Sequence, residues 1–315
     1  MPARVIAAGW HFLPIMPHPA PSSNARAVKA LMNSTQAIRF TRDASTPAHP
    51  LAERLRREVD GDVLFDAASR GRYSTDASIY QIEPVGVVVP RTMDAALAAL
   101  AIAADAGVPI LPRGAGTSQC GQTVGAALVI DASKHLNHIV EIDVANRRAV
   151  VEPGTVLDTL NATLKPHGLW FPVDVSTAAQ ATLGGMAGNN SCGTRSLTYG
   201  YMVHRVTAID GWLADGTRGR FGPMADIASP AIRAIADKAV ALWQREKDEI
   251  ARRFPRVSRH VAGYNLDALS PEGLNLAKLL VGSEGTLAWT ERITLELADI
   301  PRHKTLGVAH FPKFH

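Results

Sequence analysis

The sequence lacks the features that would mark a membrane protein, a disulfide scaffold or a metal-cluster protein. No apolar run reaches the roughly 18 residues that a membrane-spanning helix needs. Only two of the 315 residues are cysteines, Cys120 and Cys192, and they make neither a disulfide framework nor a zinc or iron–sulfur ligand set. Isolated cysteines fit a reducing compartment, so we expect a cytoplasmic protein without a membrane span.

The charge pattern gives no sign of a nucleic-acid partner. The formal net charge is +4, with 20% charged and 46% apolar residues, which is typical of a globular protein. The positive excess is spread along the chain and forms no basic run. The length allows one large domain or two modest domains with cores of their own.

Residues 1–48 differ in composition from the rest. Five basic residues precede the first acidic residue, Asp43, and prolines are frequent. Such a leader fits an organellar transit peptide. It also fits a disordered tail or a start misassigned ahead of Met32, which we favour. We predict a disordered or leader segment over 1–48 and a folded region from residue 49.

Hydrophobic periodicity predicts irregularly alternating helices and strands from residue 51 onward. Thr92 and Gly107 are expected to bound one helix, and Ser229-Pro230 to begin another. The irregular order favours an α+β fold over a doubly wound sheet. The helices are predicted over 51–59, 94–106, 156–164 and from 230, and the strands over 84–90, 108–111, 127–131, 138–143, 148–152, 206–213, 217–221, 293–297 and 306–311.

The first glycine-rich segment, residues 112–125, follows a predicted strand. Closely spaced glycines let successive backbone N–H groups turn toward a ligand, which forms a nest suited to a pyrophosphate. A P-loop is excluded because no Gly-Lys-Ser/Thr ends the segment. A Rossmann fingerprint is disfavoured because Gly114 and Gly116 fit it, but Gln119 stands at the third glycine position. A tight structural turn remains the alternative.

The second and third glycine-rich segments are residues 172–200 and 282–287. The second has many small and hydroxyl side chains and little to form a core, so it could run along a flat ligand or be a long surface loop. The third follows an apolar run at 279–281 and is predicted as a buried strand–loop–strand corner. A glutamate there, Glu284, needs a partner.

Together, in this order and spacing, the three segments resemble the FAD-binding PCMH-type domain of the vanillyl-alcohol oxidase superfamily. The resemblance covers roughly residues 51–301. It is closest to bacterial FAD-linked 2-hydroxy-acid dehydrogenases of the D-lactate and D-2-hydroxyglutarate types. Residues 73–80, 164–168, 263–266 and 282–287 also resemble the large members that add an iron–sulfur module.

The resemblance implies two α+β subdomains, about 49–135 and 136–300, with FAD between them. It implies that 301–315 begin a missing cap or substrate domain, and that an iron–sulfur cluster belongs only to a missing downstream module. Residues 113–118 would line the pyrophosphate, 182–191 the ribityl chain and flavin ring, and Val206 the adenine. The cofactor-binding residues implied are Arg113, Gly114, Ala115, Gly116, Thr117, Ser118, Gly121, Gln122, Ser176, Thr182, Gly184, Gly185, Gly188, Asn189, Asn190, Ser191, Val206 and Glu284.

The resemblance also implies a chemistry. Relatives with covalent flavin often carry a histidine where this chain has Thr117, so we expect non-covalent FAD. The reaction would be oxidation of a small 2-hydroxy acid to the 2-oxo acid, with electrons passed to iron–sulfur or a quinone, and the protein could associate with a membrane through that acceptor. Catalytic residues of the family mostly lie on the cap, so none is assigned here.

Several alternatives stay open. The chain could belong to an oxygen-using oxidase of the same superfamily, or be an inert FAD-binding fragment. An enolpyruvyl reductase on the same fold finds no support. The four histidines named below show no metal-ligand spacing, and both cysteines are expected to be small buried thiols. The histidines interpreted as surface or core residues are His135, His138, His167 and His204.

Overall fold

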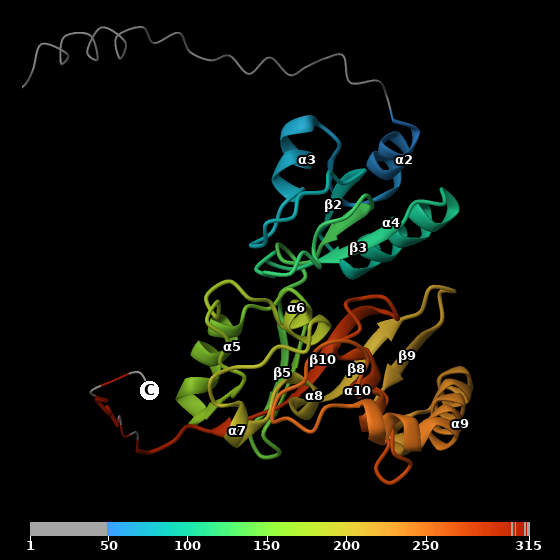
Figure 1. Cartoon of the computed structure of the whole chain (residues 1–315). Coiled ribbons are helices and arrows are strands. Elements are labelled where there is room, and N and C mark those ends of the chain that lie inside the picture. The colour runs from blue at the N-terminus through green and yellow to red at the C-terminus, as the bar shows by residue number, and fades with distance from the viewer. Residues whose placement is uncertain (1–48, 304, 306, 312, 314–315) are drawn as a thin grey trace, which may run out of the picture. The chain divides into compact units, whose positions relative to one another are not determined.

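The computed structural model describes residues 49–303, 305, 307–311 and 313 (Figure 1). The predicted leader over 1–48 lies outside this part of the chain. The fold is α+β, as predicted, with helices packed on two separate larger sheets. Within the described residues, no helix is long and apolar enough to cross a membrane.

The first sheet has four strands in the order β1-β2-β4-β3. Strands β2 (Gly86–Pro90), β4 (Leu128–Asp131) and β3 (Ile110–Arg113) are parallel, and β1 (Gly61–Leu64) is antiparallel to β2. Every residue of β2 and β4 is buried. This is the expected state of parallel strands covered on both faces.

Alternate residues of β2 explain how its two faces are covered. Val88 packs in a cluster with α2 (Pro50–Glu58) and α4 (Met93–Asp105), while Val87 and Val89 pack on the other face beside Tyr73. Tyr73 ends α3 (Ala67–Tyr73). The strand period of two therefore places α2 and α4 on one face and the end of α3 on the other.

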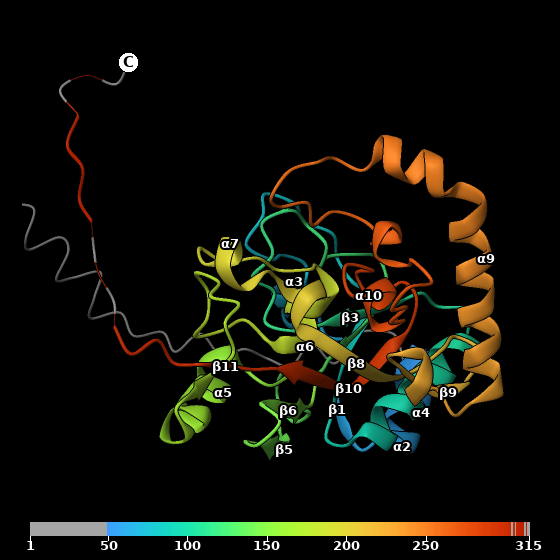
Figure 2. The same ribbon diagram turned by 90° about the horizontal axis from the view of Figure 1, so that it is seen from below.

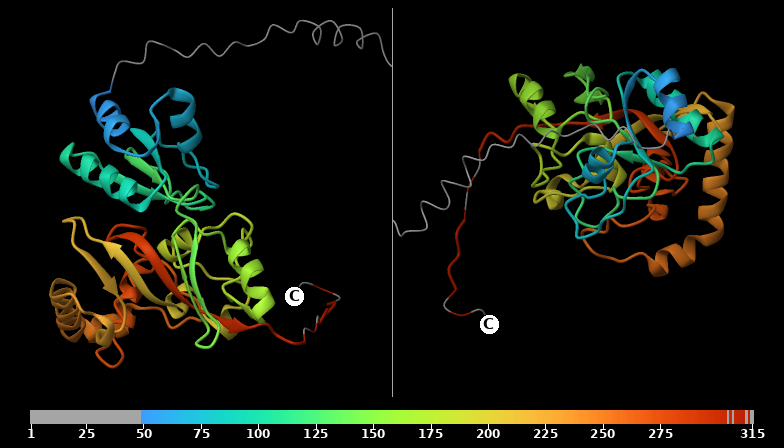
Figure 3. Two further views of the ribbon diagram at one scale, coloured as in Figure 1. Left: turned by 180° about the vertical axis from the view of Figure 1, so that it is seen from behind. Right: turned by 90° about the horizontal axis from the view of Figure 1, so that it is seen from above.

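The second sheet has five antiparallel strands in the order β5-β6-β10-β8-β9. A two-stranded sheet pairs β7 with β11. The strands are β5 (Ile139–Asp143), β6 (Arg148–Val151), β7 (Leu169–Trp170), β8 (Val206–Trp212), β9 (Arg218–Phe221), β10 (Trp289–Glu296) and β11 (Ala298–Asp299). Seen from behind, the first sheet and its helices lie above the second sheet (Figure 3).

Short helices and one long helix cover the second sheet. Helix α9 (Pro230–Arg253) lies beside β9 (Figure 2). Ile232 of this helix occupies the space where Gly219 of β9 lacks a side chain. The helices are α5 (Leu157–Leu164), α6 (Leu183–Gly188), α7 (Ser196–Tyr199), α8 (Met202–Arg205), α9 (Pro230–Arg253) and α10 (Ala277–Leu280). Three 3-10 turns are η1 (Lys165–His167), η2 (Met224–Asp226) and η3 (Leu266–Ala268).

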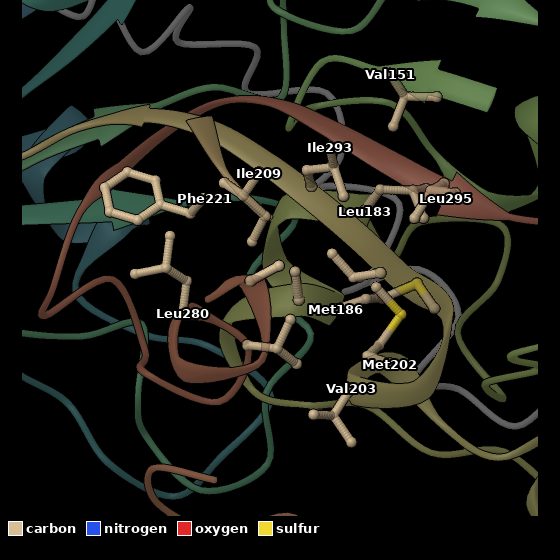
Figure 4. Close-up of a cluster of buried hydrophobic side chains, with 14 of the residues drawn as sticks. Val151, Leu183, Met186, Met202, Val203, Ile209, Phe221, Leu280, Ile293 and Leu295 are labelled. Atoms are coloured by element: carbon tan, nitrogen blue, oxygen red, sulfur yellow. The ribbon is translucent and has the colours of Figure 1, made fainter. Parts of the chain in front are cut away.

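The main core lies between the second sheet and α6, α8 and α10. Leu183 and Met186 of α6 and Met202 of α8 meet Ile209 of β8 and Ile293 of β10 (Figure 4). All five side chains are buried. Burying each such side chain contributes about 1.5–3 kcal/mol, so this cluster holds the short helices that their own hydrogen bonds could not maintain.

Local signals in the sequence located most elements correctly. Thr92 caps α4 by accepting a hydrogen bond from the Ala95 N–H, and Gly107 follows the helix with a φ of 65°. The predicted hairpins at 138–152 and 206–221 are confirmed as β5–β6 and β8–β9. Helix α9 begins at Pro230 as predicted, although the Ser229 side chain makes no capping hydrogen bond.

Three local predictions are wrong. The second segment is not structureless and does contribute to the core, because it contains α6 and α7 and buries Leu183. The run before the third segment is helix α10, not a strand. The described residues within 306–311 lie in no strand. Strand β1, helix α3, strand β7 and helix α8 were not predicted.

Two tryptophans of the second sheet reach the core beneath the first. Trp289 belongs to the cluster of α2 and α4, and its indole N–H donates to the Met93 sulfur at 3.4 Å. Trp212 packs against the same cluster and donates its indole N–H to Glu291 Oε2 at 2.8 Å. These contacts join the two sheets directly.

Replacing Glu291 with glutamine is expected to destabilise the protein by about 1–3 kcal/mol at neutral pH, because it removes a charge-assisted, bidentate hydrogen-bond pair with Arg218. Glu291 is 7% exposed and accepts hydrogen bonds from Arg218 at 2.9 and 2.7 Å and from Trp212. Burial tends to raise the pKa of Glu291, but the hydrogen bonds from Arg218 and Trp212 outweigh it and lower the pKa.

The sign of the pH dependence follows from that shift. A carboxylate with a lowered folded-state pKa contributes stability that is present above the unfolded value of about 4.3 and lost as pH falls through the folded value. The difference between wild type and Glu291→Gln in urea denaturation should therefore shrink below about pH 4. Glu296→Gln, on the same strand but half exposed, should stay within about 0.5 kcal/mol. Equal losses for both variants would contradict this role of Glu291.

Candidate functional site

One cleft gathers the glycine-rich segments that the sequence singled out. Its empty space, including the part open to solvent, is about 1230 Å³. The lining comes from the first, second and third segments, from the turn after β6 and from the start of β10. The site is therefore built at the ends of elements from both larger sheets.

The three segments touch one another at specific places. A side chain on Gly114 would collide with the Thr182 hydroxyl, so the first and second segments meet there. The Glu284 N–H donates to the Gly188 carbonyl at 2.9 Å, which joins the second and third segments. The Gln122 amide donates to Glu284 Oε1 at 3.4 Å, which joins the first and third. Several glycines of the motifs thus serve contacts between segments.

The first segment lines the cleft over residues 112–118 and carries a series of unpaired backbone donors. Among the described residues, the N–H groups of 114–119 donate to no protein acceptor, whereas the next, that of Cys120, donates to Ser118 Oγ. Gly116 has a φ of 68°, a conformation that glycine adopts without strain. A series of unpaired N–H groups around such a residue forms an anion-binding nest.

Arg113 lines the cleft, and its guanidinium is engaged by backbone carbonyls next to this loop. It donates to the carbonyl oxygens of Tyr73 at 3.1 Å, Thr123 at 2.9 Å and Thr75 at 2.7 Å. Its terminal nitrogen lies where a side chain on Gly116 would be. Burial lowers the pKa of Arg113, but a guanidinium remains charged at any physiological pH. The loop is therefore held by a cation whose hydrogen-bond partners are neutral.

Residues 73–80, which the sequence singled out only by resemblance, support this loop. The Tyr73 hydroxyl donates to Asp131 Oδ2 at 2.7 Å, and the Thr123 hydroxyl donates to Asp76 Oδ2 at 3.1 Å. Burial, and then the hydrogen bond to Asp131, raise the pKa of the Tyr73 hydroxyl. The ring of Tyr73 also lies 5.2 Å from the Arg113 guanidinium carbon.

Helix α6 differs from the first segment because its first amides are already paired. Leu183 N–H donates to the Thr155 carbonyl, Gly184 N–H to the Pro153 carbonyl at 2.7 Å, and Gly185 N–H to Thr182 Oγ1. Thr182 is the N-cap of the helix. The start of α6 therefore contributes shape to the cleft, while the free donors belong to the first segment.

A buried pair of asparagines fixes the end of the second segment. Asn190 has a φ of 54° and accepts a hydrogen bond from the Val203 N–H at 3.0 Å. Its amide donates to Asn265 Oδ1 at 3.2 Å, and the Asn265 amide donates to the carbonyls of Val281 and Lys278. The pair ties α6 and α8 to the third segment.

Asn265→Ala is expected to cost about 1–3 kcal/mol of folding stability, because it leaves the Asn190 amide and a buried carbonyl without partners. Asn265 is 4% exposed. Asn137→Ala is the matched control, since the Asn137 amide also donates to two carbonyls but is exposed. Chemical denaturation of both variants measures the difference. Equal stability of the Asn265 variant and wild type would refute the bridging role.

Most of the predicted cofactor-binding residues line this cleft. They are Arg113, Gly114, Ala115, Gly116, Thr117, Ser118, Gln122, Thr182, Gly184, Gly185, Gly188, Asn189, Ser191 and Glu284. Four others lie off the lining. Asn190 and Val206 are buried within the core, Gly121 packs under Tyr80, and Ser176 is only near the lining residues Val175 and Thr177.

Other lining residues were missed by reasoning from the sequence. Pro153 follows β6 in a Pro-Gly turn, and Trp289 and Thr290 begin β10. The Pro153-Gly154 pair directly after a strand was the available signal for a turn, but nothing local shows that this turn faces the cleft. Ile209 of β8 lines the cleft from within a strand, where no loop motif marks it.

The predictions for cysteines and histidines have mixed outcomes. Cys192 is half-buried against the main core, but Cys120 is exposed, so the prediction of a buried thiol is wrong for Cys120. It lies on the outer turn of the first segment, where no core packs. His135, His138, His167 and His204 are exposed. Among the described residues, no group of three or more His, Cys, Asp or Glu side chains could hold a metal ion.

Residues 84–222 match a protein family described as an FAD binding domain. A D-2-hydroxyglutarate dehydrogenase of Pseudomonas putida is 34% identical over 266 residues, covering 81% of this chain and 26% of that protein. The glycolate oxidase subunit GlcD of Bacillus subtilis is 32% identical over 254 residues, covering 78% of this chain and 44% of that protein. The chain thus spans about a quarter of the first relative and less than half of the second.

A solved structure of an alkyldihydroxyacetonephosphate synthase has a similar fold. The TM-score is 0.54 at 17% sequence identity, and the match covers 76% of this chain and 38% of that one. At this identity the similarity concerns the fold alone.

Proposed function

We propose that the cleft is the FAD site of a 2-hydroxy-acid dehydrogenase portion, because residues 84–222 match the FAD binding domain family. The subdomains about 49–135 and 136–300 would each supply one wall. FAD, when bound, supplies the two-electron acceptor for oxidation of a 2-hydroxy acid to a 2-oxo acid.

The observation that carries the proposal is the row of unpaired N–H groups at 114–119 next to the Arg113 guanidinium. These donors suit the diphosphate of FAD, because a nest binds anions through several amides at once and the cation next to it adds a favourable potential. The chain's own residues would then orient the cofactor. Thr182 and Gly188 would border it from the second segment, and Glu284 from the third.

The proposed substrate class is based on the names of two relatives, a D-2-hydroxyglutarate dehydrogenase and the glycolate oxidase subunit GlcD. We propose a small 2-hydroxy acid, with electrons passed to iron–sulfur or a quinone in a cytoplasmic protein, and FAD held without a covalent bond. Thr117 lines the cleft and offers no nucleophile comparable to a histidine. An oxygen-using oxidase or an inert FAD-binding fragment are the competing interpretations.

The first test is the visible absorption spectrum of the purified chain before and after acid precipitation. A flavin spectrum that leaves with the supernatant is expected. Colour retained in the pellet would be consistent with the FAD site, but it would refute the prediction that FAD is held without a covalent bond. A folded but colourless protein that takes up no added FAD would contradict the assignment of the cleft. Competition of FAD by adenosine diphosphate but not by adenosine would show that the diphosphate nest contributes to binding.

A further inference from the structure

One acidic side chain, Glu284, lines the cleft at the junction of all three glycine-rich segments. Its backbone has a φ of 52°, in the left-handed region that non-glycine residues rarely adopt. That conformation is held by the hydrogen bond from the Glu284 N–H to the Gly188 carbonyl at 2.9 Å. The carboxylate is thereby directed toward Gln122 of the first segment, whose amide donates to it at 3.4 Å.

Within the part of the chain that the structure describes, no cation is hydrogen-bonded to this carboxylate. Among those residues, Glu284 and Arg113 are the only charged side chains that line the cleft, and the Arg113 guanidinium is engaged by the carbonyls of Tyr73, Thr75 and Thr123. The first segment offers Glu284 only the neutral Gln122, and the second only Gly188 and its uncharged neighbours. The lining residues of β10, Trp289 and Thr290, are uncharged as well. The Glu284 residue is exposed, yet partial loss of solvation beside the cleft wall raises the pKa of its carboxyl group, and the hydrogen bond from Gln122 opposes this only in part.

A dinucleotide would bring two further negative charges into the same space and displace water from it. An ionised carboxylate without a counter-ion is then disfavoured by loss of solvation and by repulsion between like charges. A protonated carboxyl group avoids both and gains an O–H donor.

We propose that FAD binding takes up one proton from solvent at Glu284, which is ionised in the free protein and a neutral carboxyl group in the complex. The inference rests on the proposed function, because it needs FAD in this cleft. The linkage has a definite sign. A bound-state pKa above the free-state pKa means that affinity is complete below the free-state value and is lost as pH rises toward the bound-state value, by up to about tenfold per pH unit.

Two measurements on the whole chain test this. The dissociation constant for FAD is measured by flavin fluorescence from pH 4.5 to 8.5, and calorimetric titrations in two buffers of different ionisation enthalpy count protons taken up. Wild type should take up close to one proton within this range and bind several-fold more weakly at its upper end. Glu284→Gln keeps the shape and the neutral contact, so it should lose both the proton uptake and the pH slope and bind as tightly at pH 8 as wild type does at low pH.

The matched control is Glu296→Gln, which removes an exposed carboxylate of β10 away from the cleft and should keep the wild-type slope. Proton release on binding, with a weakened Glu284→Gln variant, would mean that an ionised carboxylate accepts a hydrogen bond from the cofactor, and would overturn the proposal. Affinity independent of pH in wild type would also overturn it, while leaving the FAD site intact. Failure of wild type to bind FAD at every pH would instead remove the proposed function itself.

If Glu284→Gln does not fold, as judged by circular dichroism, the proton count on wild type alone still decides between these outcomes.

Discussion

Arg113→Met is expected to lose at least a hundredfold in FAD affinity, equivalent to about 2.7 kcal/mol, together with folding stability. The guanidinium is the common donor to three backbone carbonyls, two of them in the 73–75 turn and one at Thr123 on the far side of the first segment. A hydrogen bond to a charged group contributes about 1.5–3 kcal/mol, so losing three should destabilise the protein by about 3 kcal/mol or more. Without the anchor, the amides of 114–119 would no longer be held in place.

The Arg113→Lys variant separates the effect of the positive charge from the effect of the guanidinium hydrogen-bond geometry. An ammonium keeps the positive charge next to the nest, but it cannot reproduce the planar fork that reaches three carbonyls at once. We expect an intermediate affinity, with most of the stability loss retained. Arg91→Met is the remote control, because Arg91 pairs with Asp60 and Asp62 on the surface and should cost less than about 1 kcal/mol. Thermal denaturation and flavin fluorescence titration measure the two effects. Wild-type affinity in Arg113→Met would refute the anchoring role.

Gly184→Ala is expected to destabilise the protein by about 1–3 kcal/mol through overpacking, and to weaken FAD binding. A Cβ atom there would lie 2.6 Å from Pro153 Cβ and 2.8 Å from the Pro153 carbonyl oxygen. The Pro153-Gly154 turn cannot move away from α6, because it is already closely packed on its other side. A Cβ atom on Gly154 would lie 2.2 Å from the Ala132 carbonyl oxygen. The backbone of α6 must therefore shift away from the turn, and the cleft wall shifts with it.

Two other glycines provide controls for Gly184→Ala. At Gly185, one residue along the same helix, a Cβ would meet only the Thr182 hydroxyl oxygen at 3.2 Å, so Gly185→Ala should be close to neutral in stability. Gly71 lies inside α3 with open space around it, and Gly71→Ala should stabilise the protein by about 0.5–1 kcal/mol. Chemical denaturation of the three variants gives the comparison. If all three alanines behave alike, backbone entropy and not the contact with Pro153 sets the cost.

Elements whose signals lie within a few residues were predictable. The Thr92 cap and the following Gly107 bound α4, and the Asp215-Gly216 turn between two β-branched or apolar runs marks the β8–β9 hairpin. The three glycine-rich segments and their order also indicated the site, because a run of glycines shows where a backbone can approach another group closely. The assignment of those segments to one FAD-binding family used their combination, since no single motif is specific.

Helix α6 shows why other elements could not be predicted. Three of its six residues are glycines, each of which disfavours a helix by about 1 kcal/mol relative to alanine. It forms because Thr182 caps it and because Leu183, Met186 and Ala187 are buried against the second sheet. Helix α10 and strand β1 similarly depend on partners elsewhere in the chain, so no local pattern distinguished them.

The sequence by itself determined the α+β class, the main helices and strands, and the three segments that form the cleft, because caps, turns and periodicity act over a few residues. The tertiary structure alone decided how these segments are used. It engaged the Arg113 guanidinium with backbone carbonyls next to the nest, placed Asn190 in a structural pair and brought Trp289 to the cleft. It also set Gln122 against Glu284 across 162 residues of chain. Contacts of such separation form only when distant elements pack together, and the free energy that selects them is distributed over the whole core.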